Sequence, residues 1–235
     1  MAKSRRLLVF GASGAIGRTV VAHGVARGWT VLGVGRGEAR QGTSGWRRYD
    51  PLEDDITVAL TGEAPFDGVA FAHGANLADS VQQFEVERHL DLYRANVLSV
   101  IAAMAALHGA GLLAIAGARL AVVSSIWQER ARGDKLSYTV TKAAVGGLVR
   151  SAAVDLGAEG HLVNGVLPGV LDTPMTAANL STEQLAGIVG RTTLGRLPDL
   201  DTVAELICFL CSGENTSING QSIAVDLGMS NAHLI

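Results

Sequence analysis

Three side chains in the middle of the chain could move a proton together. The stretch YTVTK places the phenol of Tyr138 four residues before the ammonium of Lys142, and the hydroxyl of Ser125 follows an apolar run thirteen residues upstream of Tyr138. Residues four apart on a helix lie on one face, so the phenol and the ammonium would point the same way. A free phenol has a pKa of about 10, and a nearby cation lowers it. The trio therefore fits general acid/base chemistry at a substrate oxygen that Ser125 polarises.

The same pair also has an ordinary structural explanation. Tyr138 and Lys142 could share the solvated face of a surface helix, which is the commoner origin of this spacing. A proton-transfer site for redox chemistry also needs a bound group that exchanges hydride. The choice between the two interpretations therefore depends on whether the chain carries a nucleotide-binding element.

The beginning of the chain has the pattern of such an element. The apolar run LLVF (7–10) leads directly into GASGAIG (11–17), and apolar residues then recur at helical spacing. This order predicts a strand, a glycine turn and a helix. Gly11 would allow the tight exit from the strand, Gly14 would let a pyrophosphate approach the backbone, and Gly17 would permit close helix packing. The amide groups at the start of the helix would then bind phosphates.

The next strand bears on the choice of nucleotide. TVLGV (30–34) ends in Gly35 and Arg36, so the acidic residue that would bind the ribose hydroxyls of NAD is missing. The guanidinium of Arg36 suits a 2′-phosphate, although it could also be a solvated loop residue. This pattern favours NADP(H) over NAD(H), which stays possible. Asp50 follows a third expected strand and could reach the adenine.

Composition and charge exclude several other classes of protein. The 235 residues are 48% hydrophobic with a net charge of −3, which suits an α/β domain with a large core and gives nucleic acid no basic face to bind. The lone pair Cys208 and Cys211 lies in the apolar stretch ELICFLC without further metal ligands, so both are expected in the core. The six histidines lie far apart and predict no metal site.

One long uncharged stretch raises the question of a membrane. Residues 97–118 contain no Asp, Glu, Lys or Arg, and they reach the length of a bilayer core. The stretch holds His108, is interrupted by GAG at 109–111 and is half Ala and Gly, so we expect a buried helix, a turn and the approach to a strand. The first apolar run continues into the glycine turn, which argues against a signal peptide. A cytoplasmic protein without a membrane partner is expected.

Strand and helix patterns alternate along the remainder of the chain. Continuous apolar strands separated by helices predict an α/β fold, a doubly wound parallel sheet of Rossmann type, in a single domain over residues 1–235. Ligands of such sheets bind beyond the carboxyl ends of the strands, where the strand order reverses. The remaining strands are expected near 68–72, 119–124, 161–166 and 221–226, with helices near 84–108, 137–157, 181–190 and 201–212.

Taken together, the motifs resemble those of the short-chain dehydrogenase/reductase family over nearly the whole chain. This resemblance implies that Tyr138 is the catalytic acid/base, that Lys142 lowers its pKa and binds the nicotinamide ribose, that Ser125 positions a substrate carbonyl, and that Asn96 supports a water leading to Lys142. The motifs are GASGAIG, AHGA (72–75), Asn96 in YRANVLSV, Ser125, YTVTK, NGVLPGVLDTPM (164–175) and INGQSIAVDLG (218–228).

The resemblance also implies a set of cofactor-binding residues and an activity. The chain is expected to be an NAD(P)-dependent oxidoreductase that interconverts a secondary alcohol and a ketone, with Thr173 near the nicotinamide carboxamide. The expected cofactor residues are Gly11, Ser13, Gly14, Ala15, Ile16, Gly17, Arg36, Asp50, Pro51, Ala72, Gly74, Tyr138, Lys142, Pro168, Gly169, Val170 and Thr173.

Two departures from the family pattern keep alternatives open. Glycines at 11, 14 and 17 are more usual in the extended branch of sugar-nucleotide-modifying enzymes, although the chain length suits the short branch. The usual Asn-Asn-Ala-Gly is replaced by Phe71-Ala72-His73-Gly74, so His73 either braces the strand, the preferred interpretation, or faces the cofactor. A non-catalytic dinucleotide-binding protein is the third alternative.

The substrate is expected to be a small molecule. Ser125, Trp127 and Met175 are candidate substrate residues, and Arg130 or Arg132 could meet an anionic group unless their loop is only solvated. Residues 174–190 are expected to form a mobile lid with a helix after Ser181, in which Met175, Leu180 and Ile188 give a mixed pocket. The apolar helices near 84–108 and 137–157 predict a homodimer or homotetramer.

Overall fold

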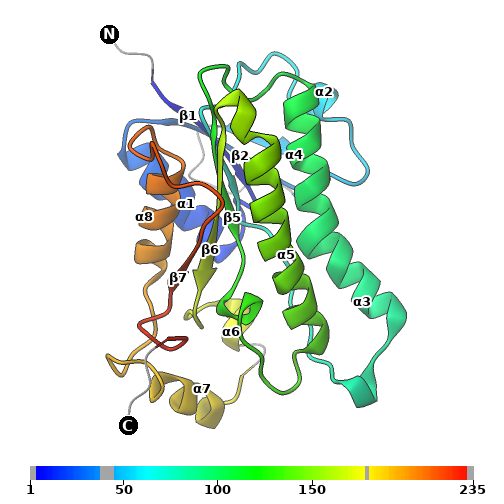
Figure 1. Ribbon diagram of the computed structural model, residues 1–235, viewed down its shortest axis with the longest axis vertical. Helices are drawn as coiled ribbons and strands as arrows, with labels where there is room; N and C mark the ends of the chain where they lie inside the picture. The colour runs from blue at the N-terminus through cyan, green and yellow to red at the C-terminus, as the bar shows by residue number, and fades with distance from the viewer. Residues whose placement is uncertain (1–3, 38–44, 178–179, 232–235) are drawn as a thin grey trace.

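Seven parallel strands form one sheet at the centre of the protein. The structure is a computed structural model that describes residues 4–37, 45–177 and 180–231. The sheet order is β3-β2-β1-β4-β5-β6-β7, so the strand order reverses between β1 and β4 (Figure 1). The strands are β1 (Arg6–Phe10), β2 (Thr30–Gly35), β3 (Gly45–Arg48), β4 (Gly68–Phe71), β5 (Arg119–Val123), β6 (Leu162–Pro168) and β7 (Ser222–Val225).

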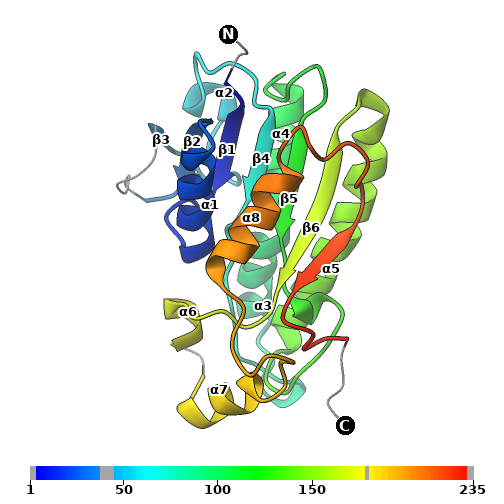
Figure 2. The ribbon, with the colours of Figure 1, turned by 90° about the vertical axis from the view of Figure 1, so that its left-hand side faces the viewer.

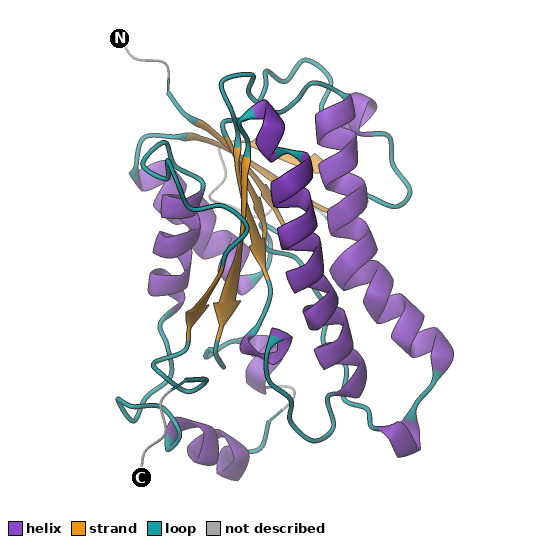
Figure 3. Cartoon of the chain, viewed as in Figure 1, coloured by secondary structure: helices purple, strands orange, loops and turns teal. Residues whose placement is uncertain are grey.

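Helices cover both faces of this sheet. Helices α1 (Ala15–Ala26) and α8 (Leu200–Leu210) lie on one face, where Figure 2 shows them in front of the strands. Helices α4 (Ser99–Gly109) and α5 (Leu136–Asp155) lie on the opposite face (Figure 3). The other helices are α2 (Ile56–Ala59), α3 (Val86–Tyr93), α6 (Pro174–Ala177) and α7 (Thr182–Val189), with 3₁₀ turns at Val81–Gln83, Ile126–Gln128 and Gly157–Glu159.

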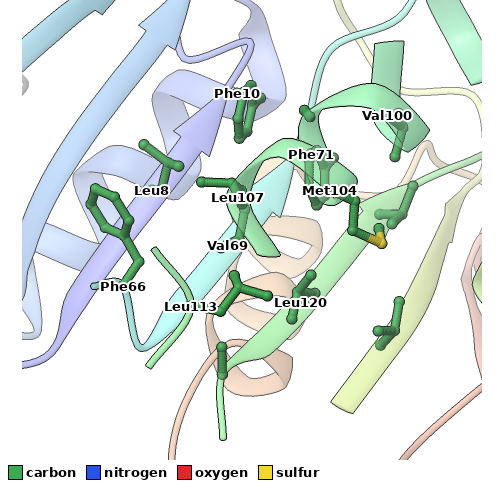
Figure 4. Packing of buried hydrophobic residues seen from close by; sticks show 14 of the residues in the cluster. Leu8, Phe10, Phe66, Val69, Phe71, Val100, Met104, Leu107, Leu113 and Leu120 are labelled. Carbon is green, nitrogen blue, oxygen red and sulfur yellow. The ribbon is translucent and has the colours of Figure 1, made fainter. Parts of the chain in front are cut away.

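The central strands are largely apolar because each of their faces meets a helical layer. In β1, Leu7 and Val9 enter the core shared with α1 and α8, while Leu8 and Phe10 enter the core shared with α4 and α5. The rings of Phe10 and Phe71 stack at a centroid distance of 5.0 Å. Figure 4 shows this second core, in which side chains of α4 rest on the middle strands. The expected doubly wound parallel sheet of Rossmann type is confirmed.

The helix expected near 84–108 contains a feature that its sequence did not predict. It runs from Val86 to Gly109, but residues Arg94–Leu98 (η2) form a π-helical turn between α3 and α4. Such single π turns are rare and are often found at functional sites. Here the turn carries Asn96, whose side chain is buried. The short helices α2 and α6 were also not predicted, since four residues carry too little periodicity to recognise.

The uncharged stretch 97–118 forms α4, a turn and the approach to β5, as expected. The helix Val86–Gly109 is long and apolar enough to cross a membrane, but length and composition alone are weak evidence. Val100, Ala103 and Leu107 are buried against the sheet, as in the core helix of a globular domain.

The two cysteines are core residues, as expected. Cys208 and Cys211 are free and fully buried, and burial raises the pKa of each thiol, that of Cys208 to about 11. Both therefore behave as small hydrophobic side chains. The described residues contain no group of histidine, cysteine and acidic side chains that could hold a metal ion.

The glycine turn can be tested with two alanine variants of equal backbone strain. Gly11 and Gly62 have φ angles of +74° and +77°, but a Cβ at Gly11 would lie 2.6 Å from the amide nitrogen of His73, whereas a Cβ at Gly62 meets nothing within 4 Å. Each Gly→Ala change should cost about 1–2 kcal/mol for the left-handed backbone. We expect Gly11→Ala to lose about 1–3 kcal/mol more through overlap, measured by urea unfolding. Equal losses in the two variants would refute this account of the turn.

Candidate active site

A cavity of about 970 Å³ opens at the carboxyl ends of the central strands. Gly11 follows β1, Ala72 follows β4 and Ser125 follows β5, and all three line it. This is the edge of the sheet where the strand order reverses, as expected for a ligand site in such a fold. The predicted residues that line the cavity are Gly11, Ser13, Gly14, Ala15, Ile16, Arg36, Asp50, Pro51, Ala72, Gly74, Ser125, Tyr138, Pro168, Gly169, Thr173 and Met175.

The glycine turn leaves backbone donors facing this cavity. Gly14 is the N-cap of α1 and is exposed, and the first intrahelical bond runs from the Arg18 amide to the Gly14 carbonyl at 2.9 Å. The amides of residues 15–17 thus have no intrahelical acceptor and are available to an anion, whereas the Gly14 amide donates to the Gly11 carbonyl at 2.9 Å. Gly17 lies beneath the turn, where a Cβ would sit 2.1 Å from the Gly11 carbonyl oxygen. Gly17 therefore shapes the turn and does not line the cavity.

The far end of the cavity carries an exposed cation. Arg36 lines the cavity at the end of β2 and makes no hydrogen bond or ion pair with the described residues. A Cβ at Gly35 would lie 2.9 Å from the Trp46 ring. The indole therefore occupies the space that an acidic side chain at position 35 would need. Asp50 also lines the cavity, and its Oδ1 accepts a hydrogen bond from the Leu52 amide at 3.1 Å.

Tyr138, Ser125 and Lys142 come together where β5 meets α5. Tyr138 and Ser125 line the cavity together, and the Ser125 hydroxyl is close enough to influence the acidity of the phenol. The Lys142 ammonium lies 5.7 Å from the centre of the Tyr138 ring and donates to the Val123 carbonyl at 3.3 Å. Lys142 is only 4% exposed, and it makes no ion pair with any described residue. The structure therefore brings together the three residues singled out from the sequence.

Burial controls the acidity of both groups. It lowers the pKa of Lys142 to about 8, because a buried cation loses its hydration. Burial also raises the pKa of the Tyr138 phenol, which the Ser125 hydroxyl lowers in part. Lys142 was expected to lower the Tyr138 pKa, but in the protein burial is the largest influence on that pKa and raises it. At neutral pH the pair is therefore a neutral phenol beside an ammonium.

Asn96 fixes the loop that closes over the ammonium. Its Oδ1 accepts from the Ala75 amide at 2.7 Å, and its Nδ2 donates to the Ala75 carbonyl and to Thr141 Oγ1, both at 3.1 Å. A Cβ at Gly74 would lie 3.1 Å from Asn96 Oδ1 and 3.6 Å from Lys142 Nζ. Glycine at this position thus leaves room for the Asn96 amide and the Lys142 ammonium beside the loop. The expected role of Asn96 in a water path stays a prediction, whereas its side chain links the β4 loop to α5.

His73 is a brace that also reaches the cavity wall. Its Nε2 lies 2.9 Å from Ser99 Oγ, and its ring packs against Phe10 and Phe71. Burial, with smaller contributions from Lys142 and Arg36, lowers the pKa of His73 to about 4, so the imidazole is neutral at physiological pH. The bond to Ser99 agrees with the preferred structural interpretation, and the ring also lines the cavity.

Comparison with known proteins identifies the family. Residues 65–230 match the family described as enoyl-(acyl carrier protein) reductase. The chain is 33% identical over 190 residues to cis-4-hydroxycyclohexanecarboxylate dehydrogenase of Sinomonas cyclohexanicum, which covers 78% of this chain and 75% of that enzyme. The chain belongs to the short-chain dehydrogenase/reductase family. The resemblance stated from the motifs is confirmed, and the relatives support an oxidoreductase of this family.

Two further relatives extend the match to the whole chain. The 3-oxoacyl-[acyl-carrier-protein] reductase of Escherichia coli (strain K12) is 29% identical over 235 residues, covering 94% of this chain and 96% of that enzyme. A short-chain type dehydrogenase/reductase from Mycobacterium ulcerans superposes with a TM-score of 0.86 at 27% identity, covering 97% of this chain and 90% of that one. The short-chain dehydrogenase/reductase fold therefore spans nearly the full sequence.

A second cavity of about 100 Å³ adjoins the first and shares Ser125 and Tyr138 with it. Trp127, Val170 and Met175 line this smaller cavity, as two of them were expected to do for a substrate. The helix α7 begins after Ser181 with the expected capping box to Gln184. Figure 2 shows α6 and α7 beyond the carboxyl ends of the strands, on the side of the cavities.

Several residues of this short-chain dehydrogenase/reductase site were not found from the sequence. Arg18 lines the main cavity, and its position directly after GASGAIG was a usable signal. Asp79 accepts hydrogen bonds from the Ser137 amide at 2.9 Å and from the Ser137 hydroxyl, and His89 Nδ1 contacts that hydroxyl at 2.8 Å. This cluster anchors the start of α5 immediately before Tyr138. Its members are far apart in sequence, so no local pattern could reveal it.

Proposed function

We propose that the chain interconverts a secondary alcohol and a ketone, with Tyr138 as the proton donor or acceptor and NADP(H) as the preferred cofactor. The observation that carries the proposal is that Tyr138 and Ser125 lie together in the walls of both cavities, with the Lys142 ammonium buried beside the Tyr138 ring. The names of the two sequence relatives, a hydroxycyclohexanecarboxylate dehydrogenase and an oxoacyl reductase, support the reaction at a hydroxyl or oxo carbon.

The residues of the large cavity fit a dinucleotide. The amides at the start of α1, beside the exposed Gly14, would hold the pyrophosphate, since no side chain caps this end of the helix. Asp50 would bind the adenine, and Lys142 the nicotinamide ribose. When bound, the nicotinamide supplies or accepts the hydride.

Side chains of the protein transfer the proton. In the direction of reduction, Ser125 donates a hydrogen bond to the substrate oxygen, and the neutral Tyr138 phenol gives that oxygen its proton. The Lys142 ammonium then stabilises the resulting phenolate, because an opposite charge nearby favours the ionised form. In the direction of oxidation, the phenolate takes the proton from the alcohol. The raised Tyr138 pKa keeps the phenol protonated at neutral pH, as an acid requires.

The preference for NADP(H) follows from the far end of the cavity. Arg36 lines the cavity and makes no ion pair with the described residues. Its guanidinium is therefore available to donate paired hydrogen bonds to a 2′-phosphate. The Trp46 ring, 2.9 Å from a Cβ at Gly35, leaves no room for an acid that would select the ribose hydroxyls of NAD. Both observations support the same cofactor.

Self-association belongs to the same proposal. Helices α4 and α5 carry large exposed apolar side chains, including Ile101, Val140 and Val154. Covering them with a second copy would remove apolar surface from water. A homodimer or homotetramer is therefore proposed for this protein, together with a cytoplasmic location.

The proton-transfer role predicts a specific result for Tyr138→Phe. This change removes only the hydroxyl, so turnover of a ketone panel should fall by at least about a hundredfold, the contribution typical of a general acid. Binding of NADPH, followed by fluorescence titration, should change less than about threefold. Tyr93→Phe is the matched control, because Tyr93 is half-buried in the main core and lines neither cavity, and it should keep full turnover. Turnover retained in Tyr138→Phe would contradict the proposal, and a wild-type chain that binds NADPH without any turnover would indicate a binding protein.

The proposed role of Arg36 predicts that Arg36→Asp shifts the cofactor preference from NADPH toward NADH. The introduced carboxylate should repel a 2′-phosphate, so the ratio of kcat/KM for NADPH to that for NADH should fall by about ten- to a hundredfold, the effect of losing a charged hydrogen bond. Arg150→Asp is the control, because Arg150 is exposed on α5 and lines neither cavity. If the NADPH to NADH ratio of kcat/KM is unchanged in Arg36→Asp, Arg36 does not bind the 2′-phosphate.

A further inference from the structure

The smaller cavity beside Tyr138 has a charge pattern that proton transfer does not require. Arg132 and Lys135 lie on its wall, and none of the described residues that line it is acidic. Ser125 and Tyr138 line the same cavity. A substrate whose reacting carbon lies at these two hydroxyls could therefore place another of its groups in this cavity.

Lys135 is held at this wall without a carboxylate. It is 5% exposed, and its ammonium donates to Asn76 Oδ1 at 2.9 Å and to the Leu77 carbonyl at 3.2 Å. An ammonium has three donors, so one makes no hydrogen bond to the described residues, and the ammonium lies 5.9 Å from the centre of the Tyr138 ring. The carboxylate of Asp79 is close enough to influence Lys135, but both of its oxygens accept hydrogen bonds from Ser137.

Arg132 supplies the second cation. It makes no hydrogen bond or ion pair with the part of the chain that the structure describes, whereas Arg130 donates to the Ser230 carbonyl and to Asn231 Oδ1. The sequence left open which arginine could meet an anion, and these contacts favour Arg132. Burial, followed by the charge of Arg132, lowers the pKa of Lys135, so the two cations are close enough to repel each other. A bound anion would offset that repulsion.

The other walls limit the size and nature of the anion. Trp127, Val170 and Leu180 make much of the remaining surface apolar. The volume of about 100 Å³ corresponds to roughly three water molecules at their share of liquid volume, so the cavity suits one small charged group and a short hydrocarbon link. A guanidinium is a planar fork that matches the two oxygens of a carboxylate.

We infer that the substrate is a small oxo or hydroxy carboxylic acid, whose carboxylate binds Arg132 and Lys135 while its reacting carbon lies at Ser125 and Tyr138. This inference rests on the proposed function and adds the substrate class. Reduction then converts an oxo acid into the hydroxy acid: the carbonyl carbon gains a hydride from NADPH, its oxygen gains the Tyr138 proton, and the carboxylate is unchanged.

Matched pairs of acid and amide test the inference. The probes are levulinate with levulinamide and oxocyclohexanecarboxylate with its carboxamide, each assayed by NADPH absorbance. The wild type should favour each acid over its amide by about ten- to a hundredfold in kcat/KM, the effect of charged hydrogen bonds. Arg132→Gln should abolish this preference by losing activity on the acid, with less than about threefold change on the amide. Arg150→Gln, at a position outside both cavities, should behave as wild type.

The outcomes separate the inference from the proposed function. Turnover of acid and amide at equal rates in the wild type would overturn the inference and leave the proposed function standing, as would a phosphorylated ketone that is preferred over both. If no ketone is turned over, the proposed function fails, and calorimetry with levulinate on Tyr138→Phe protein decides the inference. Binding that Arg132→Gln abolishes would support the carboxylate site, and absence of binding would overturn it.

Discussion

A buried ammonium without a carboxylate partner is the constraint on which the site depends. Lys142 is enclosed by the end of β5, by α5 and by the loop after β4, and the described residues give it a carbonyl oxygen as acceptor. A buried cation is costly unless something favours the charged form. The neighbouring phenol can provide that by becoming a phenolate during the reaction. The same burial that weakens the hold of Lys142 on its proton thus makes it responsive to charge on Tyr138.

The surrounding structure holds the ammonium and the phenol in place. Asn96 crosses from the π-helical turn to the backbone of Ala75 and to Thr141 of α5, so the turn, the loop after β4 and α5 share one set of hydrogen bonds. Asp79 caps the first turn of α5 from a distant loop. The side chains of the site are therefore fixed from several elements, as proton transfer over a hydrogen bond requires.

Structural features that depend on local sequence could be predicted. Features that depend on contacts between distant segments of the chain could not. The glycine turn, the YTVTK helix and the alternation of strands and helices have short-range spacing that physical rules recognise. The π turn at Asn96, the cap from Asp79 and the division of roles between Arg130 and Arg132 arise from packing between segments that are far apart in the chain. A lowered pKa was predicted for Tyr138, but burial of its side chain raises that pKa. The sequence alone did not reveal the burial.

The pKa of Lys142 is the most direct test of this account. The sequence contains three lysines, Lys3, Lys135 and Lys142, so lysine-selective isotope labelling gives three resolvable NMR signals that Lys142→Met and Lys135→Met assign. We predict that the Lys142 signal titrates near pH 8, well below the pKa of 10.5 that a free lysine has. Titration of Lys142 at the value of a free lysine would contradict it, since the ammonium would then be solvated and not enclosed beside Tyr138.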